Sequence, residues 1–103
     1  MATEAPAPAA HPKGWQGGRW LAARWQASPN FGERPPGVAV ELIVVHSISL
    51  PPGRYGGPQV IEFFTNRLNW NAHPYFQSIR GLKVSSHFFV QRSGRVWQFV
   101  DTF

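Results

Sequence analysis

The sequence contains no cysteine and few acidic residues. Without cysteine, the 103-residue chain can form neither a disulfide framework nor a thiolate metal site, so histidine and carboxylate would have to hold any metal. Nothing in the sequence brings two acidic side chains together, and there are only five of them: Glu4, Glu33, Glu41, Glu62 and Asp101. Hydrolysis by a pair of converging carboxylates is therefore not predicted.

Long apolar runs and several catalytic motifs are also missing. No stretch of eighteen apolar residues occurs, and the first residues lack both the basic and the apolar region of a secretory signal peptide. The sequence has no G-x-S-x-G elbow, no phosphate-binding loop and no H-E-x-x-H spacing. We therefore expect a cytoplasmic protein without a membrane partner, and local spacing alone does not predict zinc.

The basic residues outnumber the acidic ones, but they form no block. Ten Lys and Arg side chains give a net charge of +5, which would suit an anionic partner. They are spread singly along the chain, whereas nucleic-acid-binding proteins gather such charges in a patch or along a helix. The sequence therefore predicts no nucleic-acid partner.

The composition is that of one small globular domain. Apolar residues make up 43% of the chain and aromatic residues 15%, which is enough to pack one core. Residues 1–17 are rich in alanine, proline and glycine and predict a flexible tail, so we expect ordered structure over residues 18–103. Residues 20–25 fit either one helical turn or an extended arm.

Three segments carry patterns of regular secondary structure, and together they predict an α/β fold. Residues 38–45 are β-branched, almost uncharged and apolar on both faces, which is typical of a central strand. After a loop rich in proline and glycine over 49–57, apolar side chains recur at helical spacing over 58–68. Residues 84–91 and 96–100 predict an antiparallel hairpin with a glycine-containing turn.

The predicted sheet is incomplete. Three strands and one helix leave one face of the sheet uncovered, although domains normally bury such a layer against another. We therefore expect the chain to be a fragment, a truncated gene product or one half of an assembly. The open sheet edge also predicts a tendency to self-associate.

The four histidines lie in different sequence contexts. His46 ends the apolar run and opens the following loop, a position at which a rigid strand presents a side chain to a cleft. His87 lies in a predicted strand, His73 precedes a proline in a loop, and His11 lies in the tail. The residues alone leave two interpretations of His46 open: a metal or catalytic ligand, or a hydrogen-bonded structural residue.

Five stretches of the sequence stand out together. In sequence order they are residues 20–30, 42–57, 71–76, 82–87 and 92–100. The longest contains the unusual string His-Ser-Ile-Ser-Leu-Pro-Pro-Gly, which begins at His46. In order and spacing, these stretches resemble AmpD-type 1,6-anhydro-N-acetylmuramoyl-L-alanine amidases, within the type 2 N-acetylmuramoyl-L-alanine amidase family, and the resemblance covers residues 18–103.

The resemblance implies that residues 18–103 are the N-terminal part of a zinc amidase domain. The implied fold is a mixed β-sheet with flanking helices, as in type 2 amidases and peptidoglycan-recognition proteins. The implied activity belongs to cytoplasmic cell-wall recycling: hydrolysis of the amide between (anhydro-)N-acetylmuramic acid and L-alanine in peptidoglycan fragments. In the family, two His and one Asp hold a zinc ion that activates a water molecule.

Four residues match functional positions of the family. His46 matches the first zinc ligand. Lys83 matches a basic residue, which implies pairing with a carboxylate of the stem peptide; the residues alone fit a solvated lysine at the start of a strand equally well. Ser47 matches a substrate-binding position at which relatives often have Asn. His87 matches a His that supports the floor of the site.

The chain departs from the family pattern at its metal site. The family's second His ligand, its Asp ligand and its acid/base Glu and Lys all lie beyond the hairpin and have no counterpart in this sequence. Because one His alone holds zinc weakly, we expect the chain by itself to be catalytically inactive. The alternative hypothesis is a non-catalytic module that binds muropeptides without zinc.

Overall fold

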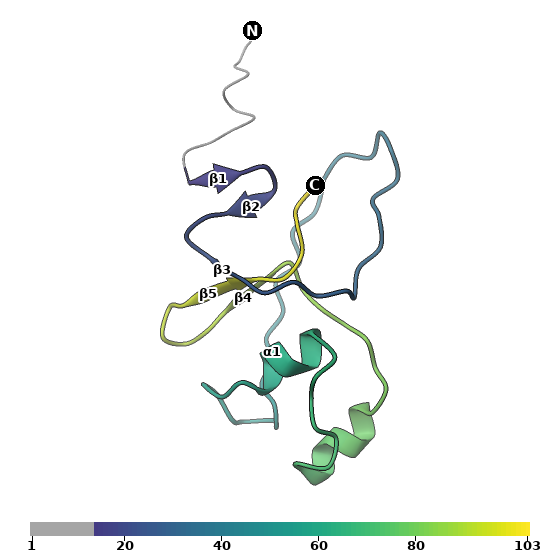
Figure 1. Ribbon diagram of the computed structural model, residues 1–103, viewed down its shortest axis with the longest axis vertical. Helices are drawn as coiled ribbons and strands as arrows, with labels where there is room; N and C mark the ends of the chain where they lie inside the picture. The colour runs from purple at the N-terminus through teal and green to yellow at the C-terminus, as the bar shows by residue number, and fades with distance from the viewer. Residues whose placement is uncertain (1–13) are drawn as a thin grey trace, which may run out of the picture.

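The computed structural model describes residues 14–103, which form two small sheets and two short helices (Figure 1). Most of the tail predicted over residues 1–17 lies outside these residues, and its last part forms the first strand. The elements are, in chain order, β1 Trp15–Gln16, β2 Arg19–Trp20, β3 Arg24–Trp25, α1 Gln59–Phe64, η2 Pro74–Ile79, β4 Phe88–Val90 and β5 Val96–Gln98.

The central sheet is mixed, in agreement with the fold class predicted from the sequence. Its strand order is β3-β5-β4: β3 runs parallel to β5, and β4 runs antiparallel to it. The predicted hairpin is confirmed, with Phe89 opposite Trp97, although its strands are shorter than expected. Gly94 adopts a φ of +90° in the connecting turn, a conformation that side-chain-bearing residues rarely adopt.

Residues 20–25 of the N-terminal arm are extended at both ends, in β2 and β3, and a turn over residues 21–23 joins them, with the Ala23 N–H donating to the Trp20 carbonyl at 3.1 Å. The segment contains no helix, so the extended interpretation is the nearer one. β1 and β2 form a separate antiparallel hairpin, and β3 then joins the central sheet. Gly18, between β1 and β2, packs so closely on the end of the chain that a Cβ there would overlap the side chain of Asp101. The arm is therefore held against the residues that follow β5.

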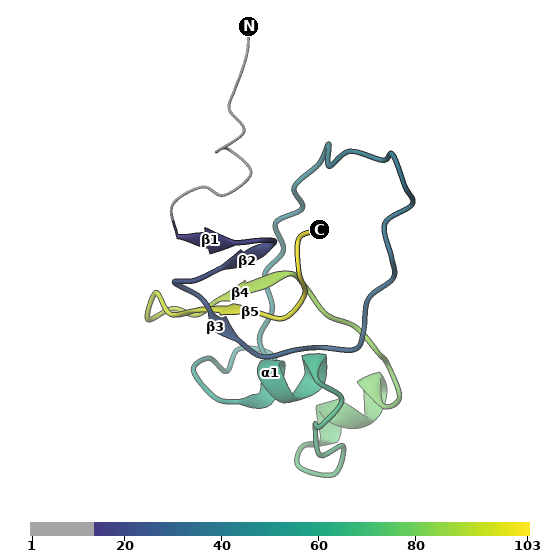
Figure 2. The same cartoon turned by 45° about the horizontal axis from the view of Figure 1, so that its top comes forward.

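Helix α1 is confirmed within the predicted helical segment, but it ends at Phe64 and does not reach residue 68. Asn66 has a φ of +60°, so the backbone leaves the helix there while Leu68 still reaches the core. The Phe64 ring packs edge-on against Phe99 of the sheet at a centroid distance of 5.3 Å. The helix lies below the central sheet (Figure 2) and covers one of its faces.

The second helix, η2, was not predicted from the sequence. His73 has an extended backbone, and Pro74 provides the first helical residue, with a φ that suits this position. The element carries Phe76 into the core, where its side chain is 1% exposed. Neither helix in the described part of the chain is long and apolar enough to cross a membrane.

The strand predicted over residues 38–45 is wrong for this structure. The segment is an extended loop that arcs away from the sheet in both views (Figures 1 and 2). Its large apolar side chains are 52% exposed at Val38 and 91% exposed at Val45. Strands form only where another strand completes their hydrogen bonds, and within the described residues no backbone hydrogen bond involves residues 39–47.

Candidate functional site

His46 and Ser47 lie at the end of the extended loop, and both residues are exposed. Neither lines the cavity described below. Within residues 14–103, no three His, Asp or Glu side chains lie close enough together to hold a metal ion. The residues that the structure describes therefore do not fit a complete zinc site, because a stable site needs three or four protein ligands.

Lys83 and His73 belong to the segments around η2. Lys83 is exposed in the connection between η2 and β4, where its ammonium group is accessible to a ligand. The His73 ring caps η2, because its Nδ1 accepts a hydrogen bond from the Tyr75 N–H at 3.0 Å. This hydrogen bond agrees with a structural role for His73.

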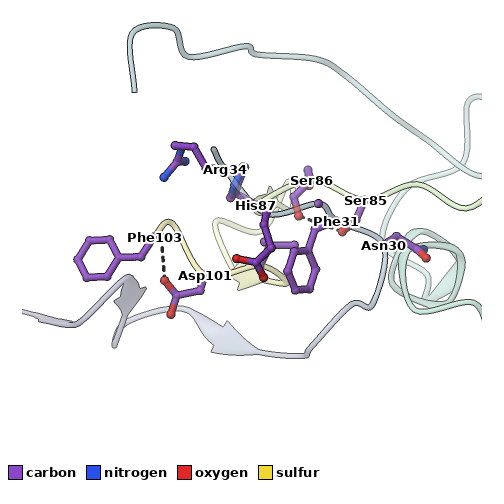
Figure 3. A pocket seen from close by; sticks show the side chains of 11 residues that line it. Asn30, Phe31, Arg34, Ser85, Ser86, His87, Asp101 and Phe103 are labelled. Atoms are coloured by element: carbon purple, nitrogen blue, oxygen red, sulfur yellow. Dashed lines mark hydrogen bonds between the residues drawn. The ribbon is translucent and has the colours of Figure 1, made fainter. Parts of the chain in front are cut away.

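The structure places His87 at the edge of a cavity of about 490 Å³ (Figure 3). Three segments form its walls: the loop after β3, the residues before β4, and the residues after β5. The lining combines aromatic rings with both signs of charge. It comprises Asn30, Phe31, Gly32, Glu33, Arg34, Ser85, Ser86, His87, Val100, Asp101 and Phe103.

Hydrogen bonds to backbone carbonyls hold the three walls of the cavity together. The Phe99 N–H donates to the His87 carbonyl at 2.8 Å, which fixes the position of His87 beside the end of β5. The Asn30 amide donates to the Val84 carbonyl at 3.0 Å, and the Arg34 guanidinium donates to the Thr102 carbonyl at 3.1 Å. The loop after β3 is thereby tied to both other segments.

The polar groups of the cavity are arranged for binding and not for nucleophilic attack. The Ser85 and Ser86 hydroxyls donate to backbone carbonyls at 3.0 and 2.7 Å, so neither proton is directed to the His87 ring. The Asp101 carboxylate accepts from the Phe103 N–H at 2.8 Å. A polar ligand with an apolar part fits this combination of carboxylate, guanidinium, imidazole and aromatic rings.

Sequence reasoning missed Arg34 and Asp101 as cavity residues and Gln98 as a structural residue. Gln98 is 1% exposed. Its side-chain oxygen accepts a hydrogen bond from the Trp20 N–H at 2.8 Å, and its side-chain NH₂ group donates to the Gly18 carbonyl at 2.8 Å and to the Val100 carbonyl at 3.0 Å. One signal in the sequence could have indicated its burial: Gln98 follows Val96 and precedes Val100 at alternate positions, so it shares one face of the strand with two apolar residues. Arg34 and Asp101 had no comparable signal, because their proximity depends on the tertiary fold.

A profile of the family described as N-acetylmuramoyl-L-alanine amidase matches residues 36–103, about two thirds of the chain. The chain belongs to the N-acetylmuramoyl-L-alanine amidase family. The matched region contains His46, Ser47, Lys83 and His87, the four residues carried over from the family, and it also contains the extended loop.

This amidase-family chain is similar in sequence to curated relatives over part of their length. The 1,6-anhydro-N-acetylmuramyl-L-alanine amidase AmpD of Citrobacter freundii is 48% identical over 82 residues, which are 79% of this chain and 44% of the relative. The protein of the same name from Escherichia coli (strain K12) is 44% identical over 82 residues, 79% of this chain and 45% of the relative. The chain thus spans less than half the length of these relatives.

A solved structure is similar to this amidase-family chain in fold as well as in sequence. The crystal structure of a Se-Met AmpD derivative superposes with a TM-score of 0.76 at 43% identity. The superposition covers 86% of this chain and 48% of that chain. The mixed sheet and its helices therefore follow the fold of AmpD.

Proposed function

We propose that the chain is one half of an amidase domain that cleaves the bond between 1,6-anhydro-N-acetylmuramic acid and L-alanine during cell-wall recycling. The observation that carries the proposal is the 48% identity to an AmpD over 79% of the chain, together with the TM-score of 0.76. The substrate would be an anhydromuropeptide. Such fragments are recycled in the cytoplasm, where we expect the chain to act.

The chain alone is assigned substrate binding but no catalytic step. Of the zinc ligands expected for the family, residues 14–103 supply His46 without two partners, and the described residues do not fit the ion. Lys83 is exposed, and its ammonium group would pair with a carboxylate of the stem peptide. Ser47, which is also exposed, would contribute polar contacts to the sugar or the peptide.

A non-catalytic module that binds muropeptides is the second candidate. The observation that favours it is the cavity of about 490 Å³ beside His87, whose lining suits a ligand with charged and apolar parts. Binding alone needs no metal ion, so this function does not require the metal ligands that the described residues lack.

Calorimetry and chromatography with an anhydromuropeptide test both candidates. We expect the chain with added zinc to bind the ligand and to release no L-alanine-terminated peptide. Lys83→Ala should weaken binding about two- to fivefold, the effect of losing one exposed ion pair, whereas Arg54→Ala, also an exposed cation, should leave affinity unchanged. Absence of binding would contradict both functions.

The two candidates separate once the missing half is added. A fusion of the chain to the part of the C. freundii AmpD outside the match should bind zinc and cleave the substrate if the chain is half of an amidase. A fusion that binds the muropeptide without binding zinc or cleaving the substrate would favour the binding module.

A further inference from the structure

A second cavity, of about 450 Å³, lies between the β4–β5 turn and the segment that leads into α1, and it is here called the turn cavity. Arg92, Ser93 and Arg95 line it from the turn, and residues 56–58 line it from the segment before α1. It shares no residue with the cavity beside His87, and it includes none of the positions carried over from the family.

Two arginines give the turn cavity a positive charge that its own lining does not balance. Arg92 and Arg95 both line it, and no acidic side chain of the described residues does. Glu62 follows Ile61 on α1 but is not part of the lining. Within residues 14–103, the guanidinium groups that donate hydrogen bonds to the protein belong to Arg34, Arg67 and Arg80. The donors of the two cavity arginines are therefore available to a ligand.

Two contacts limit the movement of these arginines. The Arg92 guanidinium lies 3.7 Å from the centroid of the Tyr55 ring, so one face of its plane is covered while the N–H groups at its edge stay free. The Arg95 N–H donates to the Ser93 Oγ at 3.3 Å within the turn. A guanidinium held in this way presents a planar fork of donors that matches two oxygens of an oxyanion.

The inner part of the turn cavity is apolar. Trp97 and Ile61 line it and are half-buried. The Trp97 indole N–H donates to the Gln91 Oε1 at 3.1 Å, which fixes the ring. A Cβ at Gly56 would meet no atom within 4 Å, so the backbone there leaves room for a ligand. The turn cavity thus offers cationic donors beside an apolar surface, a combination typical of small-molecule sites.

We propose that the turn cavity binds the phosphate group of a small phosphate monoester and holds the carbon part of that ligand against Trp97 and Ile61. A phosphate monoester carries about 1.5 to 2 negative charges at neutral pH and three acceptor oxygens, so it can neutralise both arginines. A single carboxylate would leave one of the two charges unbalanced. The proposal goes beyond the proposed function, because it concerns other residues and another class of ligand.

Calorimetry of the complete chain tests the proposal, with phenyl phosphate as the probe. We expect phenyl phosphate to bind at least about fivefold more tightly than phenylacetate, which has one carboxylate in place of the phosphate, and than inorganic phosphate, which has no ring. Equal affinity for phenylacetate would overturn the assignment of a phosphate. Equal affinity for inorganic phosphate would overturn the contact with the apolar surface.

Substitutions of exposed side chains separate a built site from general attraction by positive charge. Arg92→Gln and Arg95→Gln should each weaken the binding of phenyl phosphate about three- to tenfold. Arg80→Gln removes the same charge from an exposed arginine outside the turn cavity and should leave the affinity unchanged. Equal weakening by all three substitutions would overturn the proposal.

The position of the bound ligand provides the second measurement. In nuclear magnetic resonance spectra, phenyl phosphate should shift the signals of the Trp97 indole N–H and the Gly56 and Arg95 amides more than those of residues around the His87 cavity. Larger shifts around the His87 cavity would overturn the proposal, even with affinities in the expected order.

The phosphate site and the proposed function fail separately. A chain that binds phenyl phosphate in the turn cavity but binds no anhydromuropeptide would refute both candidate functions and leave the phosphate site standing. A chain that binds the muropeptide but not phenyl phosphate would do the reverse.

Discussion

Two buried polar residues connect parts of this chain that are distant in sequence. The Ser28 hydroxyl donates to the Phe64 carbonyl at 2.5 Å and accepts from the Asn30 N–H at 3.1 Å, so it ties the loop after β3 to the end of α1. Gln98 ties the N-terminal arm to β5. Because these groups are buried, each lost partner costs more than an exposed hydrogen bond would.

Replacing Gln98 tests how much the buried hydrogen bonds of a single residue stabilise the fold. Gln98→Leu keeps most of the side-chain volume but leaves the Trp20 N–H and the Val100 carbonyl without their side-chain partner. We expect the free energy of unfolding to fall by about 2–4 kcal/mol, measured by urea denaturation with tryptophan fluorescence. Gln16→Leu, at an exposed position of β1, should change it by less than about 0.5 kcal/mol. Equal effects of the two substitutions would contradict the role of Gln98.

At the scale of elements, patterns that need only local partners were predicted well. The β4–β5 hairpin is closed by a four-residue turn, and α1 forms its own hydrogen bonds, so both segments were found from the sequence. The strand expected over residues 38–45 is not formed, because a strand depends on a partner that the local sequence pattern cannot supply. For the same reason, sequence reasoning named His46, Ser47 and Lys83 but could not foresee that Arg34 and Asp101 would line a cavity with His87.

The contact between α1 and the sheet gives a prediction at this scale. The Phe64 ring is buried against Phe99 and meets Phe89 edge-on at 6.5 Å, so it forms the main aromatic contact between the two layers. Phe64→Ala should lower the free energy of unfolding by about 3–5 kcal/mol through lost burial and a cavity. Phe103→Ala, at an exposed ring, should cost less than about 1 kcal/mol by the same urea titration. A small effect at Phe64 would show that the helix packs elsewhere.

At the scale of the whole molecule, the chain has an amidase-family fold and a cavity of about 490 Å³, and residues 14–103 contain no group of three possible metal ligands. Helix α1 packs against the central sheet, whereas the segment over residues 38–45 stands apart from both (Figure 2).

The absence of a three-ligand cluster in the described residues gives a prediction for zinc affinity. Because residues 14–103 hold no cluster of three ligands, calorimetry of the chain with zinc should show no binding tighter than about 10 μM. The His46→Ala variant should give the same isotherm. Tight binding of one ion that is lost in this variant would contradict the expectation and indicate ligands from residues outside the described range or from a second chain.

The bond between Gln98 and Gly18 joins residues that are 80 positions apart, and this separation sets an order of events during synthesis. A ribosome adds about 5–20 residues per second, so the N-terminal arm waits on the order of 4–16 s for its partner in β5. Residues 38–45 emerge early in that interval, with the backbone of residues 39–45 unpaired. A nascent chain of this protein is therefore a candidate for chaperone capture before the sheet can close.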